Sequence, residues 1–167
     1  MSSATRLLLL AALLSLAACG FHLRGGNDNG VEFAFKSLYL KAPGESAFVA
    51  DLRRALKARK VELTATPAQA EFVLEVVSEQ GTKQVLSLSG SGRVREFQLF
   101  YRVSLRAYDN KQVDWLTADE ISLSRILPYD DEHILAKEQE ETLLYKDMRS
   151  DAVVQTLRRL SRAKPQE

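Results

Sequence analysis

Three basic side chains give this sequence its clearest capacity for ligand chemistry. Arg93 and Arg95 follow a Gly90-Ser91-Gly92 turn, and Lys137 stands among several glutamates. Guanidinium and ammonium groups make charge-assisted hydrogen bonds to phosphate, so a cluster of the three could hold a phosphorylated ligand. Taken alone, the pattern favours ordinary solvated surface charges, and a phosphate site is the alternative interpretation.

The residue content disfavours catalytic and metal sites. The chain has two histidines, His22 and His133, and one cysteine, whereas Cys/His metal sites draw several ligands from these residue types. The Gly90-Ser91-Gly92 segment lacks the Lys-Ser/Thr of a phosphate loop, so it predicts a hairpin turn. Most carboxylates fall in helical charge runs, which usually form a solvated face. We therefore expect no enzyme activity, no cofactor and no metal.

The first 20 residues carry an export pattern that ends at the lone cysteine. Arg6 precedes an apolar run over residues 7–14, which is shorter than the roughly 20 residues that span a bilayer, so residues 1–18 are expected to be a signal peptide. The segment Leu16-Ala17-Ala18-Cys19-Gly20 resembles the lipobox of bacterial lipoproteins. In that class the peptide is cut before the cysteine, and the new N-terminus carries acyl chains. The alternative is an ordinary signal peptide cleaved after Ala18, which would leave a free thiol at Cys19.

Lipidation at Cys19 would place the mature chain at a membrane without embedding it. Stable anchoring takes more than one acyl chain, at about 0.8 kcal/mol for each buried methylene. Lipoproteins of this class with Asp after the cysteine tend to stay at the inner membrane, so Gly20 points to the outer membrane, facing the periplasm. Loss of Arg6 leaves 22 basic against 22 acidic side chains, a balance that disfavours nucleic-acid binding.

The remaining chain divides into a tether and one body. Residues 19–36 are expected to form the lipidated N-terminus and a flexible tether, because residues 25–30 are all Gly, Asn and Asp. Residues 37–167 are expected to form a single globular domain. A short strand near residues 38–40 leads to a helix that Ser46 caps. The apolar positions of this helix form one stripe: Phe48, Val49, Leu52, Ala55 and Leu56.

Strands are expected to fill the middle of the chain, and a long helix its end. One strand covers residues 71–79, with a bend or bulge at Gly81-Thr82. The next strand alternates strictly, and its apolar face consists of Leu99, Tyr101, Val103, Leu105 and Ala107. A further strand ends at Pro128, with core candidates Val113, Trp115, Ile121 and Leu123. A helix over residues 130–163 carries a drifting apolar stripe that includes Ile134, Leu135, Met148 and Leu157.

The expected fold class is therefore α+β, with element order β-α-β-β-β-α. A four-stranded, mostly antiparallel sheet would carry the two helices on one face. The other face would be left to water or to a partner.

Short motifs along the mature chain resemble the LptE family of lipopolysaccharide-assembly lipoproteins. The start Cys-Gly-Phe-His-Leu-Arg-Gly at residues 19–25 is the most specific of them. Weaker similarities are Glu96-Phe97-Gln98-Leu99, Ser124-Arg125 and Leu135-Ala136-Lys137.

This resemblance implies a partner and a ligand. Members of the family sit as a plug inside the LptD β-barrel, which inserts lipopolysaccharide into the outer leaflet, and they also bind lipopolysaccharide. The family's binding positions correspond to Lys137 and to Arg93, with Arg95 competing for the second role. The competing hypothesis is a structural lipoprotein, such as a pilotin or an assembly chaperone of another envelope complex, which would need no ligand.

Overall fold

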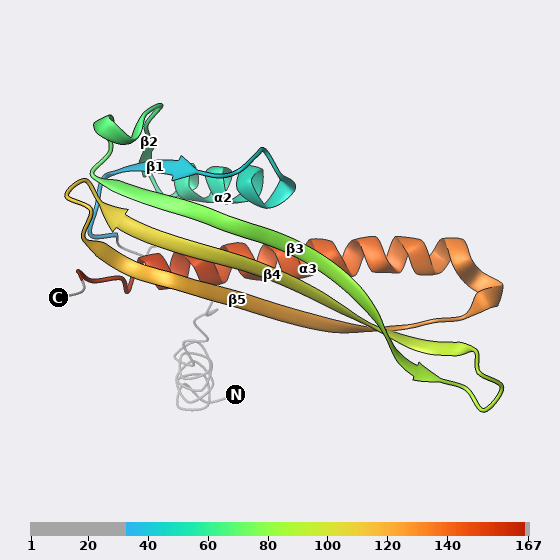
Figure 1. Cartoon of the computed structure of the whole chain (residues 1–167). Helices are drawn as coiled ribbons and strands as arrows, with labels where there is room; N and C mark the ends of the chain where they lie inside the picture. Colours follow the sequence, from blue (N-terminus) through green and yellow to red (C-terminus); the bar gives the residue numbers. More distant parts are fainter. Residues whose placement is uncertain (1–32, 166–167) are drawn as a thin grey trace, which may run out of the picture. The chain divides into compact units, whose positions relative to one another are not determined.

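The computed structural model describes residues 33–165 of the chain, which form one mixed sheet with two α-helices (Figure 1). The signal peptide, Cys19 and most of the expected tether lie outside the described residues. In chain order, the elements are β1 (Ser37–Lys41), α2 (Ala47–Ala58), β2 (Glu62–Leu63), the 3-10 helix η1 (Pro67–Gln69), β3 (Phe72–Leu88), β4 (Val94–Asp109), β5 (Asp114–Pro128), the 3-10 helix η2 (Asp131–His133) and α3 (Ile134–Leu160).

The sheet confirms the α+β fold class, but it has five strands rather than four. Their order is β2-β1-β3-β4-β5. β1 pairs in parallel with β2 and β3, and the β3–β4 and β4–β5 pairs are antiparallel. The additional strand, β2, has only two residues. A run this short has no alternation to detect in the sequence.

The sheet packs on the helices through one face. On β4, Leu99, Val103, Leu105 and Ala107 are fully buried and Tyr101 nearly so, which confirms the predicted alternation. Helix α2 begins as expected, because the Ser46 hydroxyl accepts a hydrogen bond from the Val49 amide at 3.1 Å. Four residues of its predicted stripe are buried: Phe48, Val49, Leu52 and Leu56. The core therefore lies between this sheet face and the two helices.

Helix α3 is packed along only part of its length. Its buried residues all lie in the second half: Met148, Ala152, Val153, Thr156, Leu157 and Leu160. Ile134 and Leu135 of the predicted stripe are exposed instead, Leu135 by 76%. In the first half, Leu144 and Tyr145 are partly buried against the core. Polar contacts with β3 accompany them: the Lys83 ammonium donates to Glu141 at 2.6 Å, and the Tyr145 hydroxyl donates to the Thr82 carbonyl at 2.9 Å.

β3 continues through Gly81 to Leu88, and the predicted bulge does not lie at Gly81-Thr82. The register shifts lie between Val76 and Ser78 and again between Val85 and Leu88. Gly81 has a packing role, because a Cβ there would lie 3.1 Å from Cε1 of Tyr145. The missing side chain leaves room for the tyrosine ring of α3 against β3.

Packing begins before β1. Phe35 is buried and stacks on Phe72 with ring centroids 4.3 Å apart, and Phe33 stacks on Phe35 at 5.2 Å. Phe72 in turn meets Trp115 edge to face at 5.4 Å. These four rings form an aromatic row (Phe33, Phe35, Phe72, Trp115). Its first two members belong to the segment that the sequence predicts as tether.

We expect Leu157→Ala to lower the free energy of unfolding by about 2–5 kcal/mol, because the substitution leaves a cavity between α3 and the sheet. Leu143→Ala is the matched control on the same helix, since Leu143 is 58% exposed and surface substitutions usually change stability by less than about 0.5 kcal/mol. Urea unfolding followed by circular dichroism measures both. Equal losses in the two variants would contradict the described packing of α3.

We expect Gly81→Val to destabilise the protein by about 1–2 kcal/mol, because the added methyl groups overpack the site and push the Tyr145 ring off β3. Gly44→Ala is the control, since a Cβ at Gly44 would meet nothing within 4 Å. Thermal unfolding of both variants checks the prediction. A Gly81→Val protein as stable as the parent would show that the ring does not depend on the space at Gly81.

Candidate functional site

The tip of the β3–β4 hairpin is built by serine and glycine. The Ser89 amide donates to the Arg93 carbonyl at 2.7 Å, and the Gly92 amide donates to the Ser89 carbonyl at 2.9 Å. The Ser89 hydroxyl also accepts from the Arg93 amide at 3.0 Å. Gly92 has φ +78°, a conformation that favours glycine. The tip is therefore the turn that the sequence predicts, and Arg93 lies directly after it.

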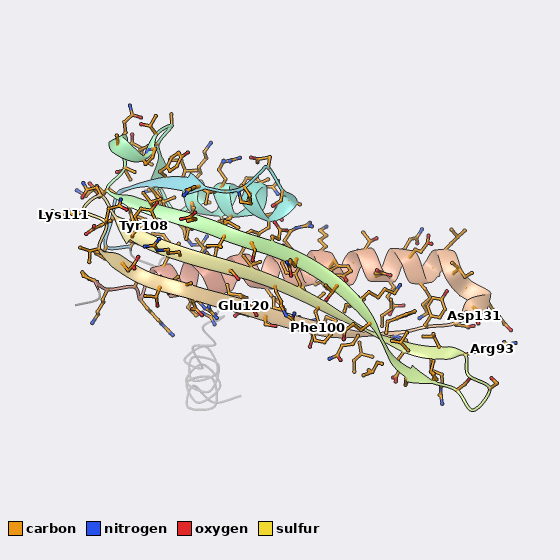
Figure 2. The ribbon with its side chains drawn as sticks, viewed as in Figure 1. Arg93, Phe100, Tyr108, Lys111, Glu120 and Asp131 are labelled. Carbon is orange, nitrogen blue, oxygen red and sulfur yellow. The ribbon has the colours of Figure 1, made fainter. Side chains whose placement is uncertain are left out.

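Arg93 and Arg95 line a hollow of about 310 Å³ together with the residues that follow β5. Figure 2 shows Arg93 and Asp131 at this end of the structure. The Tyr129 amide donates to the Arg95 carbonyl at 2.8 Å and so joins the segment after β5 to the start of β4. The lining residues are Ser89, Ser91, Arg93, Val94, Arg95, Tyr129, Asp130, Asp131 and Glu132. We call this group, together with Lys137, the hairpin-tip site.

Carboxylates balance the two arginines of this site. The Asp130 side chain accepts hydrogen bonds from the Glu132 amide and from Nδ1 of His133, both at 3.0 Å. The amide and then His133 lower the pKa of Asp130, so this group stays ionised near neutral pH. The hollow therefore offers both signs of charge to a ligand.

Lys137 is near the hollow in sequence but does not line it. It is the fourth residue of α3, and its Nζ lies 2.8 Å from Oε2 of Glu140. The lysine side chain is 21% exposed and the glutamate 42%. The structure thus brings Arg93 and Arg95 to one hollow, and Lys137 follows the acidic residues of that hollow along the chain, in the first turn of α3.

Lys83 is a further cation close to this end that the sequence did not suggest. Its Nζ lies 4.2 Å from the centroid of the Phe97 ring and 6.0 Å from that of Tyr129, in addition to its bond with Glu141. The predicted bend at Gly81 ended the strand before Lys83. Recognition of β3 as one continuous strand would have placed Lys83 on the helix face, opposite Leu99.

Exposed apolar side chains accompany the cations. They lie on the last residues of β3 and β5 and on the first residues of α3: Val85, Leu86, Leu88, Ile126, Ile134 and Leu135. Clusters of exposed apolar groups rimmed by charge mark surfaces that bind another molecule. This end of the protein has the mixed character that an amphiphilic ligand requires.

Within residues 33–165, the structure supports neither a metal site nor a membrane-spanning helix. No group of three or more His, Cys, Asp or Glu side chains is placed to hold a metal ion there. None of the helices in that range has the length and apolar character needed to cross a bilayer. Cys19, the predicted lipidation site, lies outside this range.

Solved structures share this fold. Lipoprotein B from Nitrosomonas europaea is 40% identical, with a TM-score of 0.72 over 85% of this chain and 90% of that one. Rare lipoprotein B from Shewanella oneidensis is 25% identical, with a TM-score of 0.66 over 73% of this chain and 91% of that one. A minor lipoprotein from Acinetobacter baumannii, at 22% identity and a TM-score of 0.66, covers 81% of this chain and 99% of its own and supports the fold alone.

Sequence comparison gives the family. No curated protein sequence matches the chain. The family model described as LptE, lipopolysaccharide-assembly, matches residues 35–160, which include the whole sheet, both helices and the hairpin-tip site. The chain therefore belongs to the LptE family of lipopolysaccharide-assembly proteins.

Proposed function

We propose that this protein is an outer-membrane lipoprotein, acylated at Cys19, that plugs an LptD-like β-barrel and binds lipopolysaccharide at the hairpin-tip site. The match to the lipopolysaccharide-assembly family over residues 35–160 carries this proposal. Arg93 and Lys137 are the proposed ligand contacts, and Arg95 is the alternative to Arg93.

The chemistry of the site supports a lipopolysaccharide ligand. Lipopolysaccharide carries phosphates and carboxylates on one part and acyl chains on another, and this end of the protein offers cations beside exposed apolar groups. Lys137 is held by Glu140 in a partly exposed pair. Such pairs contribute only about 0–1 kcal/mol, so a ligand phosphate can replace the glutamate at little cost.

The sheet face that points away from the helices has a polar character, which supports a position of the protein inside a polar barrel lumen. Figure 2 labels Phe100, Tyr108 and Glu120 along β4 and β5. The Arg102 guanidinium lies 5.3 Å from the Phe100 ring centroid, and that of Arg106 lies 5.2 Å from the Tyr108 centroid. The interior of a transmembrane barrel is polar, so a face of alternating charges and rings is suited to contact with such a wall.

We expect Arg93→Glu combined with Lys137→Glu to weaken lipopolysaccharide binding at least roughly tenfold. Each charge-assisted hydrogen bond contributes about 1.5–3 kcal/mol, and 1.4 kcal/mol corresponds to a factor of ten. A pull-down with labelled lipopolysaccharide measures the change. Arg95→Glu, tested alone beside Arg93→Glu, decides which arginine contributes more.

The matched control for this test is Lys57→Glu with Lys111→Glu, which changes the net charge equally at two exposed lysines outside the site. Figure 2 labels Lys111 at the opposite end of the sheet from Arg93. The control should bind normally. Equal affinity in the test variant and the parent, with the fold intact by circular dichroism, would exclude Arg93 and Lys137 as contacts.

We expect the protein purified from outer membranes to carry acyl chains on Cys19 and to co-elute with a very large β-barrel protein. Mass spectrometry of the N-terminal peptide and of the co-eluting proteins measures both. Co-elution with secretin or flagellar subunits would favour a pilotin or assembly chaperone instead. A free amino end at Cys19, with the protein in the soluble periplasm, would contradict the lipoprotein proposal.

A further inference from the structure

A second hollow lies at the end of the sheet opposite the hairpin tip. It has a volume of about 420 Å³ between the start of β5 and the residues after α3. Its lining combines an apolar wall with three cations: Trp115, Leu116, Ala163 and Pro165 with Arg159, Arg162 and Lys164. We call it the C-terminal hollow. The proposed lipopolysaccharide site uses none of these residues.

The cations of this hollow differ in what they contact. The Arg159 guanidinium pairs with the Asp119 carboxylate and donates to the Glu120 carbonyl at 3.3 Å, so it fastens α3 to β5. Arg162 and Lys164 are exposed, and no carboxylate of residues 33–165 forms an ion pair with either side chain. Arg158, on the last turn of α3, is also exposed but does not line the hollow.

Stabilisation of the helix end does not account for the whole arrangement. Cations in the last turn of a helix favour its dipole, and this explains Arg158 and Arg159. Arg162 and Lys164 lie after α3 has ended at Leu160. The dipole also gives no reason for the apolar wall, in which Trp115 is half-buried and its Nε1 donates to Asp109 at 3.4 Å.

The described chain begins beside this hollow. The aromatic row runs from Phe33 through Phe35 and Phe72 to Trp115 in successive ring contacts. The residues from Cys19 to Phe33 reach at most roughly 50 Å when fully extended. A chain anchored by acyl groups at Cys19 therefore holds the C-terminal hollow within reach of the membrane surface.

We propose that the C-terminal hollow, with Arg162, Lys164 and Trp115, docks on the anionic phospholipid headgroups of the leaflet that holds the Cys19 acyl chains. This inference rests on the acylation in the proposed function. Lysine and arginine near a bilayer are attracted to anionic lipids, and tryptophan favours the membrane interface, where its ring is partly apolar and its N–H is polar.

This contact orients the protein. The hairpin-tip site lies at the other end of strands β3 and β4, each of which is at least 16 residues long. With the C-terminal hollow on the headgroups, Arg93 and Lys137 lie at the opposite end of the sheet from that contact. The acyl anchor alone limits the distance from the headgroups, whereas the second contact also fixes which end of the sheet lies next to them.

Trp115 reports on this contact directly, because it is the only tryptophan in the chain. The acylated protein is reconstituted into phosphatidylethanolamine vesicles, with or without phosphatidylglycerol, that contain lipids brominated near the top of the acyl chains. We expect Trp115 fluorescence to be quenched in the phosphatidylglycerol vesicles, and quenching to fall at least twofold without phosphatidylglycerol, in 0.5 M salt, or in an Arg162→Gln/Lys164→Gln variant.

A matched pair of single substitutions controls for charge. Arg162→Gln should reduce the quenching, whereas Lys146→Gln, which removes the same charge from an exposed position away from the hollow, should not. Circular dichroism verifies that each variant is folded, and flotation verifies that it is anchored.

Three results would overturn the proposal. Variants that float with the vesicles and are quenched like the parent would leave the anchor intact and exclude docking through these cations. A parent protein that does not float would contradict the acyl anchor itself, and docking would fail with it. A shift in Trp115 emission on addition of glycerol phosphate in detergent, without quenching in vesicles, would assign the hollow to a free phosphate ligand.

Discussion

The length of helix α2 limits how much of the sheet it can cover. A helix rises about 1.5 Å per residue and a strand about 3.3 Å. The 12 residues of α2 therefore cover about 18 Å, whereas the 17 residues of β3 extend over about 55 Å. Helix α2 contacts β3 as far as Glu79, whose carboxylate accepts a hydrogen bond from Ser46. Beyond this point β3 has no second apolar layer from α2, and the protein divides into a well-covered end and a sparsely covered one.

Glu79 marks the boundary between these two ends. One of its oxygens accepts from Ser46 at the start of α2, and the other accepts from the Tyr101 hydroxyl on β4 at 2.6 Å. Burial, and then Glu79, raise the pKa of Tyr101, which keeps the phenol protonated as a donor. A partly buried polar cluster with its partners satisfied fixes the position of α2 on the sheet more specifically than apolar packing alone.

The covered end could be predicted from the sequence, because there burial imposes a period. The alternation on β4 and the stripe of α2 each follow from one buried face, and both are confirmed. The sparsely covered end could not be predicted in this way. Lys83 and Tyr145 are held by contacts between residues far apart in the chain. The predicted stripe of α3 includes Ile134 and Leu135, but both side chains are exposed.

The candidate site shows the same limit. Arg93 and Arg95 stand near each other in the sequence, yet nothing local pairs them with η2, whose carboxylates lie more than 30 residues later. Without that pairing they resemble ordinary surface charges. The resemblance to the LptE family supplied the functional interpretation of Lys137, and the structure adds its ion-pair partner, Glu140.

The sparsely covered end also leaves part of a strand edge open. β1 pairs only with Phe72–Glu75 of β3, so the rest of β3 is a long edge with exposed Val77, Val85 and Leu88. Open apolar edges invite pairing between copies. The register shifts at Val76/Ser78 and Val85/Leu88 interrupt that edge. They make pairing between copies less favourable, although the apolar side chains stay exposed. In the proposed complex, a barrel wall around the hairpin would separate one copy from another, while the same exposed groups remained available to an amphiphilic ligand.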